Sequence, residues 1–597
     1  MAGAVVWLRL LVGCAAILGA ALSQQPALVQ LRVEVLDAAT RSPVPGAAVI
    51  LHSTSLAVRR EVVTPSSGTV LFEVPTGRYS LLVRHNAYLS GFYGQRSAGD
   101  LPQPLSLTDL SRPKQVVMLL WRPGIVSGSL EDDSDEPIAG AEVRALKKSF
   151  KTGRLRYVTA ATTRTDDRGG YRFSSLTPGL YVIAAVSSAA PRPSRNDIED
   201  PRRPSPSWFY PTVFYPGVSS TSGAVELEVD SGTSYSRIDF ETRPAEAGDL
   251  QGIVIGQSPC TVIIELRDQA TEELTDLPFP KARCSASGAF KFSNLPPGQY
   301  RVRVVDIPQQ QPSLRPDGSI VATRIEGRLI VAGGYLGELP FAPIQSRTTL
   351  WAEAEARVAP PDPHNPQSAI RLQLAEGTSI AGRLVFVGKE PPSRNRVFMA
   401  GVEVRDADGH ELGPTPVVPV EPDGTFETIG LPPGRYFVDV TPGWPDWFLR
   451  SRQIQGRDFS TSPIDLRVLS DAAVRSVVVE YSHRQIAVSG TVRSVDGRLS
   501  PDATVFFFPS DARYWADLGE SSVRHGRIRT DEDAVFQANG ALPGEYCFVA
   551  TSSSAGLAGW TWGDPDFLRA LAPGCTRVSV DVSNQDILLT ARALPKR

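Results

Sequence analysis

The chain has few of the side chains on which enzymes, metal proteins and nucleic-acid binders commonly rely. Its 597 residues include only six histidines, eight lysines, three methionines and five cysteines. The 61 basic residues, 53 of them arginine, nearly balance 64 acidic residues and leave a net charge of −3. So small a net charge argues against binding to nucleic acid or to an anionic membrane. Beyond the N-terminus there is no run of 18 apolar residues, so we expect no membrane-spanning helix.

The usual catalytic and phosphate-binding motifs are also missing. The sequence contains no His-Glu-x-x-His, no Gly-x-Ser-x-Gly and no Gly-x-x-x-x-Gly-Lys. Without a Cys-x-x-Cys pair, zinc and thioredoxin-like redox roles fit poorly. We therefore expect no enzymatic activity, no cofactor and no metal. Two acidic stretches, Glu131–Glu136 and Asp406–Asp408, are interpreted as solvated loops, and whether they bind calcium stays open.

The first 23 residues have the pattern of a secretory signal peptide. Arg9 ends a short basic region, Leu10–Ala21 is apolar, and Ala21-Leu22-Ser23 offers small residues for cleavage. Leu11–Cys14 also resembles a lipidation box, but the apolar run continues past Cys14, so lipidation is the less favoured interpretation. We expect a mature protein that is exported, either secreted or held in the periplasm or at the cell surface.

Length and composition predict several β-domains. The chain is about four times as long as a typical domain of ~150 residues, which excludes a single core. Glycine and proline number 50 each, above the usual share but below that of low-complexity disorder. Helical signals are nearly absent, and short strands with closely spaced turn signals indicate β-sandwiches.

A Gly-x-Tyr motif followed by a strand occurs five times. Only 15 tyrosines are present, so five in one register are not chance. Proline precedes the glycine in four copies, which predicts a type II turn with the glycine at positive φ. The residues of the repeat turn are Gly77, Tyr79, Gly179, Tyr181, Gly298, Tyr300, Gly434, Tyr436, Gly544 and Tyr546.

The strand after each motif alternates between apolar and polar residues. In the third copy, Tyr300 and Val302 are expected to face the core, with Arg301 and Arg303 on a wet face.

An upstream hairpin accompanies the motif. In the three middle copies a glycine lies ten residues before the turn glycine, at Gly169, Gly288 and Gly424. The first copy is one residue out of register at Gly68, and the last has no hairpin glycine. Strand pairing in these two copies is left open.

Together these motifs resemble a known domain. The order strand, Gly-Ala-x-Val, hairpin glycine with a following aromatic, and Leu-Pro-Pro-Gly-x-Tyr is similar to the carboxypeptidase regulatory-like, or transthyretin-like, domain. Leu295–Tyr300 and Leu431–Tyr436 show the last motif in full. The resemblance implies a sandwich grouped with carbohydrate-binding-like folds, found in tandem in secreted bacterial proteins. It implies a fold and an extracytoplasmic setting more than an activity.

We therefore predict an all-β, tandem array of about five transthyretin-like or immunoglobulin-like sandwiches after the signal peptide (1–23). The second sandwich is expected to carry a proline- and aromatic-rich insertion at 189–217. The predicted sandwiches span 29–122, 123–246, 247–377, 378–485 and 486–597.

Four cysteines remain after the signal peptide. An even number in an exported chain suggests disulfides, and three pairings are possible. The local pairs Cys260–Cys284 and Cys547–Cys575 each fall within one repeat and are favoured, with four free thiols as the alternative.

The insertion is the only segment that suggests recognition. Trp208–Tyr215 holds five aromatics in eight residues, among them Trp208, Tyr210, Phe214 and Tyr215. The rings either cover a sandwich edge or form an exposed platform for a sugar or a partner protein. The leading hypothesis is thus a non-catalytic exported binding or structural protein that recognises carbohydrate. The alternative is an envelope scaffold that binds other proteins.

Overall fold

The structure is a computed structural model of the chain and is built almost entirely from β-strands. Two compact units divide it, one containing β1–β8 and the other β9–β46 together with Arg96–Leu101. The structure describes residues 28–53, 58–103, 105–107, 113–151, 154–190, 208–256, 261–266, 281–308, 322–325, 328–331, 346–359, 369–393, 400–408, 415–441, 447–515, 524–552, 564–581 and 585–594. The expected signal peptide lies outside this range.

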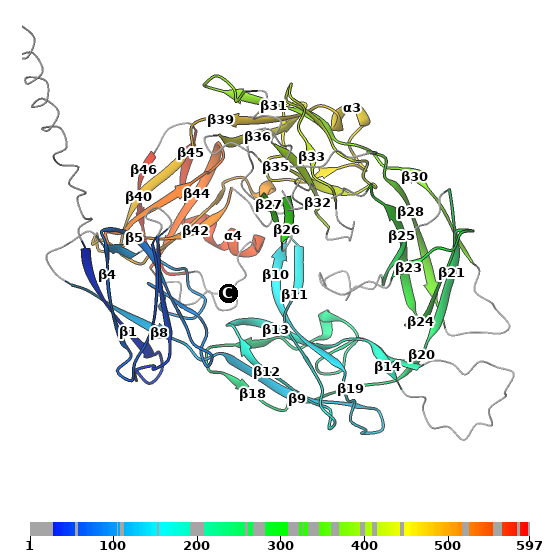
Figure 1. Ribbon diagram of the computed structural model, residues 1–597, viewed down its shortest axis with the longest axis horizontal. Helices are drawn as coiled ribbons and strands as arrows, with labels where there is room; N and C mark the ends of the chain where they lie inside the picture. Colours follow the sequence, from blue (N-terminus) through cyan, green and yellow to red (C-terminus); the bar gives the residue numbers. More distant parts are fainter. Residues whose placement is uncertain are drawn as a thin grey trace, which may run out of the picture. The chain divides into compact units, whose positions relative to one another are not determined.

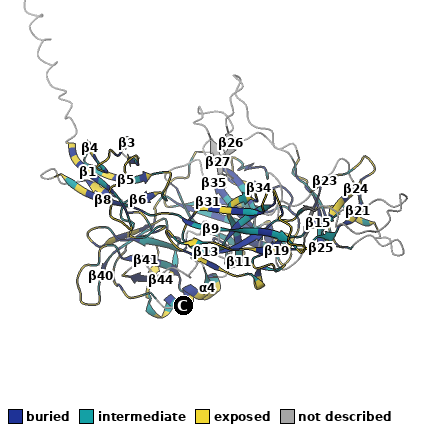
Figure 2. Ribbon diagram, turned by 90° about the horizontal axis from the view of Figure 1, so that it is seen from below, coloured by how far each residue is buried: buried dark blue, intermediate teal, exposed yellow. Residues whose placement is uncertain are grey.

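The first sandwich pairs the sheets β4-β1-β8 and β3-β2-β5-β6, with β7 beside β5. Exposed residues along β1, β4 and β8 are yellow in Figure 2. Its strands are β1 (Leu28–Asp37), β2 (Ala48–Ser53), β3 (Val58–Val63), β4 (Thr69–Pro75), β5 (Gly77–Arg84), β6 (Gly91–Phe92), β7 (Leu105–Leu107) and β8 (Lys114–Leu120).

The second sandwich pairs β12-β9-β18 with β11-β10-β13-β16. β19 lies beside β9, β17 lies beside β13, and β14-β15-β20 form a small third sheet. Its elements are β9 (Gly124–Asp132), β10 (Glu142–Lys151), β11 (Arg154–Arg164), β12 (Gly170–Leu176), β13 (Gly179–Ala185), β14 (Ser188–Ala190), β15 (Trp208–Tyr210), β16 (Val213–Phe214), the 3-10 helix η1 (Thr221–Gly223), β17 (Leu227–Val229), β18 (Ser234–Tyr235), β19 (Phe240–Thr242) and β20 (Ala245–Glu246).

The third sandwich pairs β24-β21-β29 with β23-β22-β25-β28-β30, and β26 and β27 form a separate hairpin. Its strands are β21 (Gly248–Ile255), β22 (Thr261–Leu266), β23 (Lys281–Arg283), β24 (Ala289–Leu295), β25 (Gly298–Asp306), β26 (Ala322–Ile325), β27 (Arg328–Val331), β28 (Leu350–Val358), β29 (Ile370–Gln373) and β30 (Ala375–Glu376).

The fourth sandwich pairs β34-β31-β39-β36-β37 with β33-β32-β35-β38. Its elements are β31 (Ala381–Val387), β32 (Gly401–Asp406), β33 (Val418–Pro419), β34 (Thr425–Glu427), β35 (Arg435–Thr441), β36 (Phe448–Ile454), β37 (Arg457–Asp458), β38 (Ile464–Asp465), α3 (Asp471–Val474) and β39 (Val477–Ser482).

The fifth sandwich pairs β43-β40-β46 with β42-β41-β44-β45, and the helix α4 packs beside the second sheet. Its elements are β40 (Ala487–Arg493), β41 (Thr504–Pro509), η2 (Ala512–Tyr514), β42 (Gly526–Arg529), β43 (Val535–Asn539), β44 (Gly544–Thr551), α4 (Pro565–Leu571), η3 (Ala572–Gly574), β45 (Thr576–Val580) and β46 (Gln585–Thr590).

One pairing scheme recurs in all five sandwiches, and Figure 1 labels many of the strands involved. The first strand of each (β1, β9, β21, β31, β40) runs antiparallel to β4, β12, β24, β34 or β43. The same first strand runs parallel to a late strand, as β1 does to β8 and β40 does to β46. In the second sheet, β2 and β5, and their four counterparts, pair antiparallel. The predicted tandem all-β architecture is confirmed. The first and last copies, whose strand pairing was left open, follow the same scheme. The five residue boundaries stay predictions.

The repeated tyrosine is buried and makes the same hydrogen bond in every sandwich. Each tyrosine is at most 3% exposed. Its hydroxyl donates to the backbone carbonyl oxygen four residues earlier, at 2.6–2.8 Å. This resembles the tyrosine corner of immunoglobulin-like sandwiches, which fixes where a strand leaves a turn. The acceptors are Pro75, Thr177, Pro296, Pro432 and Leu542.

The type II turn predicted at the motif glycine is wrong. Gly77, Gly179 and Gly544 do have positive φ, at 159°, 155° and 151°, but these values are far from the +80° of that turn. At Gly434 the glycine leaves room for the tyrosine, whereas at Gly179 an added Cβ would meet Lys147. A Cβ at Gly434 would lie 3.0 Å from the Tyr436 hydroxyl oxygen, which is tighter than ordinary contact.

The upstream hairpin glycines do need positive φ. Gly68, Gly169, Gly288 and Gly424 have φ of 67–86°. In the fifth sandwich Ala534 takes this place with φ of 60°. Its carbonyl oxygen accepts from Val492 N–H at 2.9 Å, just as the four glycine carbonyls accept from their own first strands. The turn therefore forms without glycine, which the sequence pattern did not reveal.

The wet face expected on the third motif strand is only partly present. Arg301 is half-buried, and Arg303 is 4% exposed and pairs with Glu353 at 3.2 Å. Glu353 and Glu355 lie directly across on β28. The opposite charges on the neighbouring strand explain how a guanidinium is accommodated in a buried position.

We expect Tyr436→Phe to lower the free energy of unfolding of the fourth sandwich by about 1–2 kcal/mol, because the Pro432 carbonyl oxygen would lose its donor in a buried site. Denaturant unfolding read by hydrogen exchange would measure this. Tyr235→Phe is the matched control, since its hydroxyl donates to Glu228 O at 2.9 Å in an exposed place. An equal loss in both variants would contradict a special role for the buried bond.

We expect Gly288→Ala to destabilise the third sandwich by about 2–3 kcal/mol, because φ is positive and the added Cβ would lie 2.1 Å from Val254 O. Ala534→Gly should change stability by no more than about 0.5 kcal/mol. Relief of left-handed strain is offset there by the lost methyl burial and the entropy of glycine. Thermal unfolding of both variants tests this, and a neutral Gly288→Ala would refute it.

Candidate functional site

The aromatic part of the predicted insertion, from Trp208 on, folds as part of the second sandwich, while residues 191–207 lie outside the described residues. Trp208–Tyr210 is strand β15, paired with β14 and β20. Val213–Phe214 is strand β16, which extends the sheet next to β13. Both strands are therefore held by backbone hydrogen bonds to the sandwich, and the segment is not a free loop.

Two of the four predicted ligand-binding rings are core residues. Phe214 is 0% exposed and packs against Tyr157 and Val182 in a small apolar cluster on the outer side of β13. Tyr210 is 6% exposed and lies in the main core of the sandwich. Neither ring can stack on a sugar without unfolding. Trp208 and Tyr215 are half-buried and are the only two of the four with part of the ring accessible.

Tyr215 also contributes to packing. Its ring lies edge-on to that of Phe240, with centroids 6.3 Å apart, against the main core. The side chain of Trp208 places its indole nitrogen in a buried position. These contacts favour the interpretation that the rings are structural. The alternative, that Trp208 and Tyr215 form an exposed platform for a sugar or a partner protein, stays a prediction.

The first acidic stretch, Glu131–Glu136, contains a turn that is stabilised by the carboxylate of Asp132. Asp132 accepts from the backbone N–H groups of Ser134 and Glu136 at 2.9 and 3.0 Å. The Tyr210 hydroxyl donates to Asp132 at 3.4 Å. Burial, together with the nearby carboxylates of Asp132, Asp133 and Glu136, raises the pKa of Tyr210 to about 12. The carboxylate therefore has a structural role in the strand connection.

The second acidic stretch is neutralised by an arginine. Arg435, the residue before the repeated tyrosine, pairs with Asp408 at 2.7 Å, and both side chains are at most 13% exposed. The Asp406 carboxylate accepts from Asp408 N–H at 2.7 Å. A buried arginine competes with any cation for this carboxylate.

Further ion pairs lie on the fourth sandwich. Asp439 on β35 binds Arg405 and Arg452, at 2.5 and 2.8 Å. Burial acts to raise the pKa of Asp439, but the two guanidinium groups outweigh it and lower the pKa. These bidentate-capable arginines account for part of the unusual excess of arginine over lysine.

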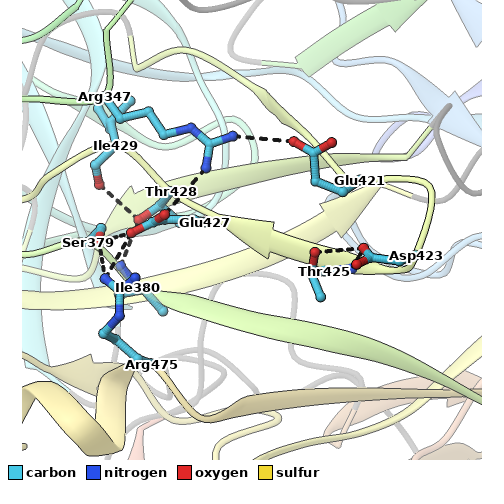
Figure 3. A network of polar contacts seen from close by, with 10 residues as sticks. All are labelled: Arg347, Ser379, Ile380, Glu421, Asp423, Thr425, Glu427, Thr428, Ile429 and Arg475. Carbon is cyan, nitrogen blue, oxygen red and sulfur yellow. Dashed lines mark hydrogen bonds and ion pairs between the residues drawn. The ribbon is translucent and has the colours of Figure 1, made fainter.

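A second polar network centres on Glu427, and Figure 3 draws its residues. The carboxylate accepts from the Ser379 hydroxyl at 2.7 Å and from Arg475 at 2.8 Å. Arg347 approaches from the other side and lies 3.6 Å from both Glu427 and Glu421. Hydrogen bonds from Ser379 and Arg475 and the two positive charges lower the pKa of Glu427 despite partial burial. Sequence reasoning missed this network, because its members lie far apart in the chain and share no motif.

The disulfide Cys547–Cys575 is confirmed, with a Cα–Cα distance of 5.2 Å. Cys547 lies on β44 and Cys575 follows η3, so the bridge ties the helical segment to the sheet. There α4 packs Phe567, Leu568 and Leu571 against β41 and β44. Cys284 is also disulfide-bonded, whereas Cys260 lies outside the described residues.

Within the described ranges, no group of three or more histidine, cysteine, aspartate or glutamate side chains is arranged to hold a metal ion. In the same ranges, no helix has the length and hydropathy needed to cross a membrane. His525 is half-buried, and its desolvation lowers its pKa to about 4, which keeps the ring neutral at physiological pH.

The comparisons with known proteins agree with the predicted domain type. Residues 125–198 match the family model of the carboxypeptidase regulatory-like domain, so the predicted resemblance is confirmed for this segment. No curated protein matches the chain.

Several solved structures of bacterial surface proteins are distantly similar. The minor pilin GBS52 of Streptococcus agalactiae shares 18% identity over 36% of this chain and 96% of its own, with a TM-score of 0.19. The shaft pilin SpaA of Lactobacillus rhamnosus GG shares 12% identity over 37% of this chain and 98% of its own, with a TM-score of 0.18. The TIE protein of Bacillus anthracis shares 10% identity over 95% of this chain and 68% of its own, with a TM-score of 0.13. TM-scores this low carry no inference about function.

We expect Cys575→Ser to lower the free energy of unfolding of the fifth sandwich by about 3.5 kcal/mol, the loop-entropy value for a bridge of this span. The third sandwich, which does not contain this bridge, serves as the internal control. Calorimetry of the exported protein, with hydrogen exchange to assign the transitions, would measure the effect. A loss shared equally by both sandwiches would contradict a local role.

We expect acid to weaken the Glu427 network. The folded-state pKa lies below the ordinary 4.5, so its stabilisation is complete above 4.5 and is lost as pH falls through the folded pKa. Glu427→Gln should therefore reduce stability at pH 7 by up to about 1 kcal/mol, since the group is partly exposed. The variant should equal the wild type near pH 2, and thermal unfolding across pH 2–7 tests this. A constant difference at all pH values would contradict it.

Proposed function

We propose that this protein is a non-catalytic, exported scaffold whose tandem sandwiches hold and space other envelope proteins. The observation that carries the proposal is that the chemically distinctive side chains are used by the fold itself. The repeated tyrosines bind backbone, Asp408 and Asp439 bind arginines, and Phe214 fills a core. What distinguishes the molecule is a repeated architecture.

Export is supported by sequence and by redox state. The N-terminal segment has the charge, apolar run and small residues of a signal peptide. The bridge between Cys547 and Cys575 needs an oxidising compartment to persist in most organisms.

Exposed apolar residues on edge strands support the proposal that the chain binds other proteins. Leu71 on β4 is 70% exposed, Val117 on β8 is 53% exposed, and Leu588 on β46 is 63% exposed. Each of these strands lies at the edge of its sheet. Edge strands with accessible backbone and apolar side chains are common places for a second protein to add.

Carbohydrate binding remains the second candidate, supported by the partly accessible rings of Trp208 and Tyr215. It has lost much of its original basis, because Tyr210 and Phe214 are buried.

Site-specific photo-crosslinking in the producing cells tests the scaffold. A photo-reactive residue at Leu71, Val117 or Leu588 should give the same protein adducts in repeated experiments, and one at buried Val33 should give none. Glycan-array binding of the purified chain runs in parallel. Absence of protein adducts, combined with glycan binding that Trp208→Ala abolishes while the melting temperature holds, would reject the scaffold in favour of carbohydrate recognition.

A further inference from the structure

The core of the fourth sandwich includes a residue from the third. Ile307, which directly follows strand β25, is 5% exposed and belongs to the same apolar cluster as Tyr436, Val479 and other residues of β31–β39. Val305 at the end of β25 packs against that cluster as well. In the other four sandwiches, the main core clusters of described residues contain only side chains from the same sandwich.

A second connection runs through the backbone. Arg347 O, just before β28, accepts from Gly430 N–H at 2.8 Å, and Gly377 N–H donates to Thr349 O at 2.9 Å. Thr378 and Leu431 then form a bridge with two hydrogen bonds of 2.9 and 3.0 Å. The approach is so close that a Cβ at Gly377 would lie 2.6 Å from Leu431 N.

The Glu427 network adds a third connection (Figure 3). Arg347 comes from the segment leading into β28, while Glu427 ends β34 and Arg475 follows α3. Arg347 therefore joins the third sandwich to carboxylates of the fourth. Ser379, which lies between β30 and β31, is bound by Glu427 and Arg475 together.

We propose that the third and fourth sandwiches are one folding unit, locked by the insertion of Ile307 into the fourth core and by the Arg347–Glu427 contact. The apolar contribution is large, because a fully buried isoleucine is worth about as much as any single core residue. Unfolding the third sandwich would withdraw Ile307 and leave a cavity in the fourth. A scaffold would gain a rigid joint at this place. The folding coupling itself goes beyond the proposed function and does not depend on it.

Native-state hydrogen exchange of the full chain tests the coupling. Val302→Ala removes buried methyl groups from the third core, and Val479→Ala does the same in the fourth, both at 0% exposure. Each variant should accelerate the slowest amides of both sandwiches by the same factor, about tenfold or more. The slow amides of the first and fifth sandwiches serve as references and should keep their rates.

Confinement of each effect to the sandwich that carries the substitution would overturn the proposal. Should a variant fail to fold, the wild type gives the same answer in low denaturant. The slowest amides of both sandwiches should then follow one line with one slope, because they exchange through one opening. Two separate lines would show two independent domains.

The joint itself is probed by Ile307→Ala. Ile307→Ala should speed the slow amides of β35 and β39, although the substitution lies outside the fourth sandwich. Exchange in β35 and β39 that Ile307→Ala leaves unchanged would contradict insertion as the lock.

Discussion

Every sandwich depends on one buried hydrogen bond, from the hydroxyl of the repeated tyrosine to the backbone carbonyl oxygen four residues before it. The ring fills the core at the start of a central strand, while the hydroxyl satisfies a carbonyl that the turn would leave unpaired in an apolar place. In the fourth sandwich, glycine two residues earlier also avoids a clash, since a Cβ at Gly434 would lie 3.0 Å from the Tyr436 hydroxyl oxygen. In every copy of the motif the tyrosine ring packs in the core and its hydroxyl donates to the backbone, which explains why the motif recurs.

Around that device, the sandwiches differ in what covers the second face of the tyrosine strand. Phe214 and its neighbours cover β13, and α4 with its disulfide covers β44. On β25 the cross-strand partners Glu353 and Glu355 accompany buried arginine. These additions convert a strand with one apolar face into one buried on both sides. The aromatic insertion, the helical segment and part of the arginine excess all answer the same physical need.

The fold was largely predictable from the chain because its signals are local. Turn glycines, apolar alternation and the tyrosine register act within about a dozen residues, so they survive without knowledge of distant contacts. The fifth hairpin shows the limit of this reasoning. Ala534 adopts the left-handed conformation that glycine has elsewhere, since the surrounding pairing between β40 and β43 imposes it.

By itself, then, the sequence determined the all-β class, the number of tyrosine motifs and the domain type, and it favoured the pairing of Cys547 with Cys575 that the structure shows. Only the tertiary structure decided which side of each ring faces water and which charges meet. Phe214 and Trp208 are equally aromatic in sequence, yet one is 0% exposed and the other half-buried. Arg347, Glu427 and Arg475 carry no shared pattern, because ion pairs between distant segments depend on distance in space and not on spacing in the chain. Burial and charge contact are properties of packing, so no local signal could reveal them.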